Sequence, residues 1–124
     1  MRCLHPAKPK AGVNVDGEVK EAKIVSVKDN NSMRLNFPAY GRMYQWKCKF
    51  DGIYLPICKS NDPDEKNLGK LTRDAIRNRI LGKTLKVTCG RIDLDGKLRV
   101  DIHVDGKSMV EWLTENEYVN REYK

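Results

Sequence analysis

The sequence has no apolar run long enough to cross a bilayer, so it predicts neither a membrane-spanning segment nor a membrane partner. It also lacks the G-x-x-x-x-G-K motif that cradles phosphates, which argues against a P-loop nucleotide site. The first ten residues, MRCLHPAKPK, are basic but are not followed by an apolar segment. Such a start does not predict a secretory signal, and we expect an intracellular protein.

Cysteine and histidine are too sparse to predict a metal-binding cluster. There are four cysteines and two histidines, and no two cysteines have the C-x-x-C spacing of a zinc site. A cysteine nucleophile needs a neighbouring base, and neither His5 nor His103 has an evident cysteine partner. We therefore expect neither zinc nor cysteine-based catalysis, but buried and reduced thiols at Cys3, Cys48, Cys58 and Cys89.

Acidic residues are fewer than basic ones. Lys and Arg number 24 and Asp and Glu number 17, which gives a formal net charge of +7 at pH 7 and a pI near 9.3. With 124 residues, of which 40% are hydrophobic, the chain fits one domain that buries roughly two thirds of its unfolded surface. A basic surface attracts polyanions and favours nucleic acid as a partner, whereas simple solubility is the alternative explanation of the charge.

The chain divides into two parts. Residues 1–18 hold two prolines, two glycines and scattered lysines without an apolar period, which predicts a basic, flexible N-terminal arm. Residues 19–124 are expected to form one folded domain. Apolar and polar residues alternate or recur at helical spacing there, predicting strands at 24–27, 33–37 and 44–50, a helix at 67–81, strands at 85–89 and 98–104, and a short C-terminal helix from residue 109.

This order of elements predicts a mainly β fold with helices, of the α+β class. Five short antiparallel strands with a helix between the third and the fourth have the connectivity of the five-stranded oligonucleotide-binding (OB) barrel. A split sheet with two helices on one face has similar periodicity and is the alternative.

The expected helix 67–81 has two distinct faces. Its apolar residues recur at helical spacing on one side, which predicts that this side packs on the core. Lys70, Arg73 and Arg77 recur at spacings of three and four on another side. Such a basic stripe is either a solvated helix face or a row of phosphate contacts.

Four segments resemble the staphylococcal nuclease (thermonuclease) family. Residues 24–35, IVSVKDNNSMRL, resemble the part of that family in which a strand runs into Asp-Gly-Asp-Thr and out into a second strand. Residues 49–57, KFDGIYLPI, resemble its Arg-Leu-x-Gly-Ile-Asp-x-Pro-Glu segment. The others are LGKTLKV at 81–87, after the helix, and the hairpin and glycine turn at 95–113. Together they cover about residues 22–123, and the resemblance implies the OB barrel.

The resemblance also implies a set of catalytic positions. Family nucleases hold calcium with two aspartates, position a water with a glutamate and steady the phosphate with two arginines. In this sequence the aspartates fall on Asn31 and Tyr54, the glutamate on Ile57, and the arginines on Lys49 and Lys97. No carboxylate remains, and lysine keeps the charge of arginine without its bidentate geometry. The resemblance therefore implies a catalytically inactive relative that has lost the calcium site and needs no other cofactor.

A relocated metal site is the alternative that leaves some phosphodiesterase activity. The carboxylates that could lie near the same cleft are Asp29, Asp51, Asp62, Asp64 and Glu65. Their simpler interpretation is structural, with Asp29 forming a turn, Asp51 ending a strand, and the acidic loop favouring the start of the helix.

Three aromatic residues also have competing interpretations. Tyr54, flanked by Lys49 and Lys97, is either a platform on which bases stack or a plug that fills the vacated metal pocket. Trp46 and Trp112 are either core residues or rings on which bases stack, and because they are spaced with core residues we expect both to be buried.

The leading functional hypothesis is a nucleic-acid-binding module on an inactive nuclease barrel, with DNA and RNA both open. The residues expected to bind nucleic acid are Lys47, Lys49, Tyr54, Arg73, Arg77 and Lys97. One alternative is a protein-interaction or virion structural module that meets a partner with an acidic surface. The sequence most resembles the versions that large double-stranded DNA viruses encode, which implies a place in the infected host cell or the virion.

Overall fold

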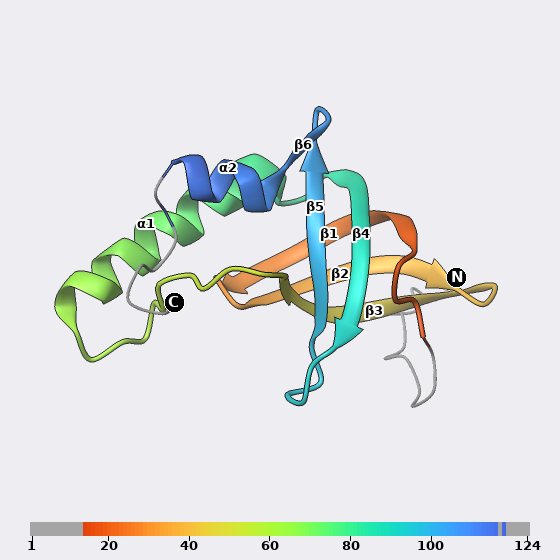
Figure 1. Ribbon diagram of the computed structural model, residues 1–124, viewed down its shortest axis with the longest axis horizontal. Coiled ribbons are helices and arrows are strands. Elements are labelled where there is room, and N and C mark those ends of the chain that lie inside the picture. The colour runs from red at the N-terminus through yellow and green to blue at the C-terminus, as the bar shows by residue number, and fades with distance from the viewer. Residues whose placement is uncertain (1–13, 117, 119–124) are drawn as a thin grey trace, which may run out of the picture.

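The computed structural model describes residues 14–116 and residue 118 (Figure 1). The predicted order of three strands, a helix, two strands and a helix is confirmed, and a two-residue strand is added before the last helix. The elements are β1 (Val19–Asp29), β2 (Ser32–Ala39), β3 (Arg42–Phe50), α1 (Pro63–Ile80), β4 (Thr84–Ile92), β5 (Leu98–Val104), β6 (Lys107–Ser108) and α2 (Met109–Glu115). Neither helix of this part of the chain is long and apolar enough to cross a membrane.

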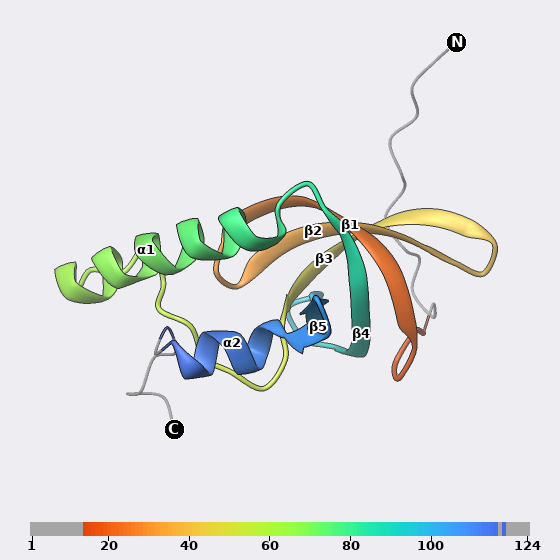
Figure 2. The same ribbon diagram turned by 90° about the horizontal axis from the view of Figure 1, so that it is seen from above.

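Five of the strands close into a barrel (Figures 1 and 2). β1 pairs antiparallel with β2 and β4, β2 pairs with β3, and β4 pairs with β5. A parallel pairing between residues 48–50 of β3 and 98–100 of β5 closes the ring. This arrangement is an OB-like barrel of the mainly β, α+β class, so the predicted fold class is confirmed and the split sheet is excluded.

The core fills the inside of the barrel and is covered by the two helices. Trp46 is 2% exposed, stacks on Phe37 with ring centroids 4.5 Å apart, and donates its indole N–H to the Phe37 carbonyl oxygen at 3.1 Å. Its predicted burial is confirmed. The predicted burial of Trp112 is wrong, because this residue is only half-buried. Its ring packs at the edge of the core, stacks on Tyr118 with ring centroids 5.5 Å apart, and has the Arg79 guanidinium 4.7 Å from its centroid.

α1 begins at Pro63, earlier than the predicted start at Asn67. The acidic segment before Asn67 resembles a loop, but its residues are those that start a helix. Asp62 is the N-cap and accepts a hydrogen bond from the Asp64 backbone N–H at 3.0 Å, and proline at the first helical position needs no N–H partner. The predicted helix-start role of the acidic loop is therefore confirmed, and the loop itself is shorter than expected.

The core begins ahead of the predicted boundary at residue 19. Val15 is 2% exposed, and the Gly17 backbone N–H donates to the Cys89 carbonyl oxygen at 2.8 Å. Tyr40 donates its hydroxyl hydrogen to the Asn14 carbonyl oxygen at 2.9 Å. Residues 14–18 thus pack on the barrel, and the rest of the predicted arm lies outside the described residues.

Three of the four cysteines lie in the described part of the chain. Cys48, Cys58 and Cys89 are buried and free, as predicted. Burial raises the pKa of the Cys58 thiol, and it raises the pKa of Cys89 to about 11. These thiols are therefore protonated at neutral pH and are poor nucleophiles. The prediction for Cys3 lies outside the described residues.

The β1–β2 turn holds α1 at a buried junction. Asn30 is 2% exposed and donates from Nδ2 to the carbonyl oxygens of Pro56 at 2.7 Å and Gly69 at 2.9 Å. Gly69 approaches the backbone of Ile57 so closely that a Cβ atom there would stand 2.7 Å from the Ile57 carbonyl carbon. The Asn30 side chain and the close approach of Gly69 therefore hold the β1–β2 turn, residues 56–58 and α1 together at one buried contact.

Candidate nucleic-acid interface

A pocket of about 460 Å³ opens at the end of the barrel beside this junction. Its walls come from the β1–β2 turn, the end of β3, the segment that follows β3, and β5. Most of its lining is apolar, and Lys49 and Arg99 supply the charges. The lining residues are Asn30, Asn31, Lys49, Phe50, Gly52, Ile53, Tyr54, Leu55, Ile57 and Arg99.

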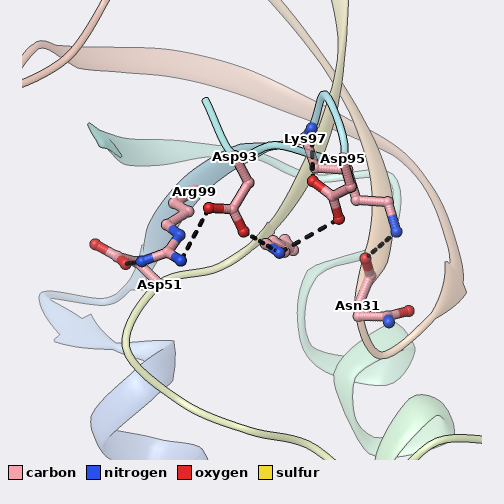
Figure 3. A network of polar contacts seen from close by, with 7 residues as sticks. Asn31, Asp51, Asp93, Asp95, Lys97 and Arg99 are labelled. Atoms are coloured by element: carbon pink, nitrogen blue, oxygen red, sulfur yellow. Dashed lines mark hydrogen bonds and ion pairs between the residues drawn. The ribbon is translucent and has the colours of Figure 1, made fainter. Parts of the chain in front are cut away.

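The cations of the pocket are paired with carboxylates (Figure 3). Lys49 forms ion pairs with Asp93 and, at 3.3 Å, with Asp95, both from the turn between β4 and β5. Arg99 binds the other oxygen of Asp93 at 2.9 Å and lies 3.6 Å from Asp51. Asp93 therefore bridges two cations that face each other across β3 and β5.

These ion pairs shift the pKa values of their members. The hydrogen bond from Lys49 lowers the pKa of Asp93 from its ordinary value of 3.8, and the same bond raises the pKa of Lys49. The Asp93 carboxylate also raises the pKa of Arg99. Because the folded-state pKa of Asp93 is lowered, its stabilising effect is fully present above pH 3.8 and is lost as the pH falls through the lowered value.

Lys97 lies on the other side of the same turn. Its ammonium group donates to the backbone carbonyl oxygen of Asn31 at 2.9 Å, which ties the β4–β5 turn to the β1–β2 turn. The three cations around the pocket, Lys49, Lys97 and Arg99, are thus matched in number by Asp51, Asp93 and Asp95. Carboxylates around the pocket therefore balance the charge of these three cations.

The remaining positions of the family pattern also line the pocket. Tyr54 is 63% exposed, so its ring lies at the rim of the pocket and does not fill it. Ile57 is 38% exposed on the wall next to α1. Asn31 is exposed and contributes its backbone oxygen to Lys97. The resemblance therefore aligns residues that do lie together, and none of these three carries a carboxylate.

Two of the carboxylates considered for a relocated metal site end strands. Asp29 ends β1, and its Oδ1 accepts the backbone N–H of Asn30 at 2.7 Å and that of Cys58 at 3.5 Å. Asp51 follows β3 and pairs with Arg99. Both contacts agree with the structural interpretation of these residues.

The other three carboxylates belong to the start of α1. Asp62 caps the helix, Asp64 and Glu65 lie in its first turn, and Glu65 accepts the Ser60 hydroxyl hydrogen. Negative charge at a helix N-terminus is stabilised by the helix dipole. Within residues 14–116 and 118, no three Asp, Glu, His or Cys side chains are grouped as metal ligands.

The outer face of β2 and β3 carries two exposed cations. Arg34 and Lys47 are directly opposite each other in the two strands, and both are exposed. Arg34 donates from Nη1 to the Gln45 side-chain oxygen at 3.1 Å, and Gln45 donates to the Asn36 side-chain oxygen at 3.3 Å. Two cations and two amides thus form one polar surface.

The predicted stripe on α1 is present but only partly exposed. Arg77 donates from Nε to the Val27 carbonyl oxygen at 2.8 Å, which attaches α1 to β1. Arg73 Nε lies 3.5 Å from the Asp74 carboxylate on the same helix. Lys70 is exposed. Both arginines therefore have structural contacts in addition to any contact with a ligand.

Two basic residues of these surfaces were not identified from the sequence. Arg34 alternates with Met33 and Leu35, which already indicates an outward position, but its place opposite Lys47 follows only from the β2–β3 register. Arg99 lies two residues after Lys97, and that spacing could have indicated it.

No family model matches this chain, and no curated protein matches it. The resemblance of residues 22–123 to the thermonuclease family therefore stays a hypothesis, and the function has to be inferred from the geometry of the site.

Proposed function

We propose that this protein is a catalytically inactive, thermonuclease-like OB domain that binds the phosphate backbone of nucleic acid on the outer face of β2 and β3. The observation that carries the proposal is the pair Arg34 and Lys47, two like charges directly opposite each other. Both side chains are exposed, and one phosphate group can contact a guanidinium and an ammonium group on neighbouring strands at the same time. In OB barrels this face and the neighbouring loops bind oligonucleotides.

Further support comes from the overall charge and the polar neighbours. The net charge of +7 attracts a polyanion from a distance. Asn36 and Gln45 add amide groups that can donate hydrogen bonds to phosphate or sugar oxygens. Contacts with the sugar–phosphate backbone can be made with DNA or with RNA. Tyr54, 63% exposed at the pocket rim, provides a ring on which a base can stack.

The proposed lack of hydrolysis rests on side-chain chemistry. Asn31, Tyr54 and Ile57 occupy the positions that match the metal and water ligands of the family, and they offer no carboxylate. A hard divalent cation prefers anionic oxygens, and without it the charge on the attacked phosphate is not offset. Lys49 and Lys97 make secondary contributions to binding, because their ammonium groups already bond within the protein.

A protein-interaction or virion structural module is the second candidate. Its support is a group of exposed apolar side chains at the end of the β4–β5 hairpin, where Ile92 is 52% exposed and Leu94 is fully exposed. Apolar side chains in such positions are typical of contacts with a protein partner.

Binding measurements on Arg34→Gln/Lys47→Gln test the proposal. We expect affinity for a fluorescent single strand to fall at least about tenfold, or about 1.4 kcal/mol. We also expect the slope of log K against log salt to become shallower by about 1.4, which is about 0.7 for each lost phosphate contact on a single strand. The measurement is fluorescence anisotropy over a salt series.

The matched control is Lys86→Gln/Arg91→Gln, which removes the same two charges from exposed positions on β4. It is expected to bind almost as tightly as the wild type. Equal losses in the two variants would show that only net charge matters, and would contradict a site on β2 and β3.

A further inference from the structure

We infer that the binding surface continues from the outer face of β2 and β3 onto one flank of α1, and that the ligand is a single strand long enough to lie along both. The inference rests on the proposed function and adds the form and minimum length of the nucleic acid. It follows from a basic stripe on α1, from the contact that joins this stripe to β1, and from the path that the two surfaces make together.

The α1 stripe consists of Lys66, Lys70, Arg73 and Arg77. Spacings of four, three and four place these side chains on one flank of a helix with 3.6 residues per turn. Lys66 and Lys70 are exposed, and the two arginines are half-buried. The buried residues of α1 are Gly69, Thr72, Ile76 and Ile80. They lie on the adjoining face, so the stripe borders the surface by which α1 contacts the rest of the protein.

Arg77 joins the stripe to the barrel. Its Nε donates to the Val27 carbonyl oxygen of β1 at 2.8 Å. Val27 is buried, so the next residue, Lys28, points to the outside, where it is exposed. The stripe therefore ends beside a strand that presents a further cation on the outer face of the barrel.

The path then crosses two more strands. Ser26 of β1 is opposite Arg34 of β2, and Arg34 is opposite Lys47 of β3. Neighbouring strands are about 5 Å apart, so a backbone on this face meets a cation at each of the last two steps. α1 contacts β1, β1 contacts β2 and β2 contacts β3, and on this basis we infer that their exposed basic residues form one track.

Two carboxylates lie beside the track near its middle. Asp74 lies 3.5 Å from Arg73, and Asp29 directly follows Lys28 in β1. They offset part of the charge of the arginines and of Lys28. Lys66 and Lys70 are the exposed cations of the α1 stripe, and Asp74, four residues after Lys70, lies on the same side of the helix and offsets part of its charge too.

The length of the track sets the length of the ligand. Lys66 and Arg77 are separated by about 16 Å along the helix, at about 1.5 Å per residue. The step from β1 to β3 adds about 10 Å. A stacked strand rises about 3.4 Å per nucleotide, so these two legs alone, without the step from α1 to β1, correspond to a minimum of roughly eight nucleotides. The smallest binding sites of OB barrels take about four nucleotides, and a ligand of that length covers only the α1 part or only the barrel part of the track.

The shape of the track favours a single strand over a duplex. α1 extends away from the barrel in roughly the direction in which β1 and β2 run (Figure 2). The path from β1 to β3 instead crosses the strands, so the track turns where it leaves α1. Duplex DNA has a persistence length of about 150 base pairs and does not follow such a turn over eight nucleotides, whereas a single strand does.

The experiment compares ligand lengths with the full chain. Fluorescent oligothymidylates and oligouridylates of 4, 8, 12 and 16 nucleotides, and a 16-base-pair duplex, are titrated with the wild type, with Lys66→Gln/Lys70→Gln and with Lys86→Gln/Arg91→Gln. Wild-type affinity is expected to rise between 4 and 8 nucleotides, the estimated length of the track, to level off by 12, and to exceed that for the duplex. Lys66→Gln/Lys70→Gln is expected to bind the 12-mer about tenfold more weakly and the 4-mer as tightly as the wild type, with a salt slope on the 12-mer shallower by about 1.4.

The outcomes separate this inference from the proposed function. If Lys66→Gln/Lys70→Gln binds the 12-mer like the wild type while Arg34→Gln/Lys47→Gln binds it weakly, the track is wrong and the site on β2 and β3 stands. A preference of the wild type for the duplex also overturns the track. If the wild type binds no ligand of any length, the proposed function fails together with the inference.

Discussion

Replacement of Asn30 by aspartate is expected to destabilise the fold by at least about 3 kcal/mol, since each buried polar group left without a partner costs about 1–3 kcal/mol and a charged one costs more. Asn30 is 2% exposed and donates to the carbonyl oxygens of Pro56 and Gly69. An ionised aspartate at this position would place a carboxylate against those two acceptors. Urea unfolding followed by tryptophan fluorescence measures the change in the free energy of unfolding.

The adjacent residue provides the control. Asn31 is exposed, and its contact with Lys97 uses the backbone oxygen, which a substitution keeps. Asn31→Asp is therefore expected to change stability by less than about 0.5 kcal/mol. Similar losses at the two positions would mean that the junction among the β1–β2 turn, residues 56–58 and α1 does not depend on the Asn30 amide.

Replacement of Gly69 by alanine is expected to destabilise the protein by about 1–3 kcal/mol, the usual effect of overpacking. A Cβ atom here would stand 2.7 Å and 2.8 Å from the carbonyl carbon and oxygen of Ile57. Those are backbone atoms, so α1 must shift and strain the Asn30 hydrogen bonds. The loss is expected although alanine favours a helix over glycine by about 1 kcal/mol.

Asn67→Ala is the matched control for that substitution. Asn67 is exposed on the same helix, and alanine there is expected to leave stability unchanged or raise it by about 0.5 kcal/mol. The two variants are compared in the same urea titration. A Gly69→Ala protein as stable as Asn67→Ala would contradict the close approach of α1 to residues 56–58.

Much of the fold follows from local patterns. Alternation in β1, β2, β3 and β5 identifies the strands, because side chains of one face must be apolar to fill the barrel. The sequence pattern places the start of α1 too late, because the acidic residues after Asp62 are typical of both loops and helix starts. Val15 could not be assigned to the core, since it lies among glycines and prolines and its burial depends on contacts with distant strands.

The sequence predicts which residues lie together around the pocket, but it does not predict which carboxylates pair with the cations there. The family resemblance brings Asn31, Lys49 and Lys97 together, and the structure places all three around one pocket or its rim. Lys49, however, pairs with Asp95, which is 46 residues away, and with Asp93 of the same turn. Pairings over such distances depend on strand register and hairpin geometry, which alternation does not determine.

The ion pairs of Lys49 and Arg99 explain why we place the nucleic-acid site outside the pocket. Carboxylates of the β4–β5 turn already occupy Lys49 and Arg99, so a phosphate entering the pocket would have to displace them. On the outer face of β2 and β3, Arg34 donates to the neutral side-chain oxygen of Gln45. A phosphate that replaces Gln45 as the acceptor brings a negative charge to the guanidinium, which makes the hydrogen bond stronger. We therefore propose that nucleic acid lies across the outer face of β2 and β3.

The most direct test of the central claim measures binding and cleavage of one labelled single strand with one preparation of protein. Binding is followed by anisotropy over a salt series, and cleavage is followed on a denaturing gel with calcium, magnesium or manganese and with a chelator. We expect salt-sensitive binding with an intact strand under every metal condition. Cleavage that the chelator abolishes would contradict it and would indicate a metal site formed by other carboxylates.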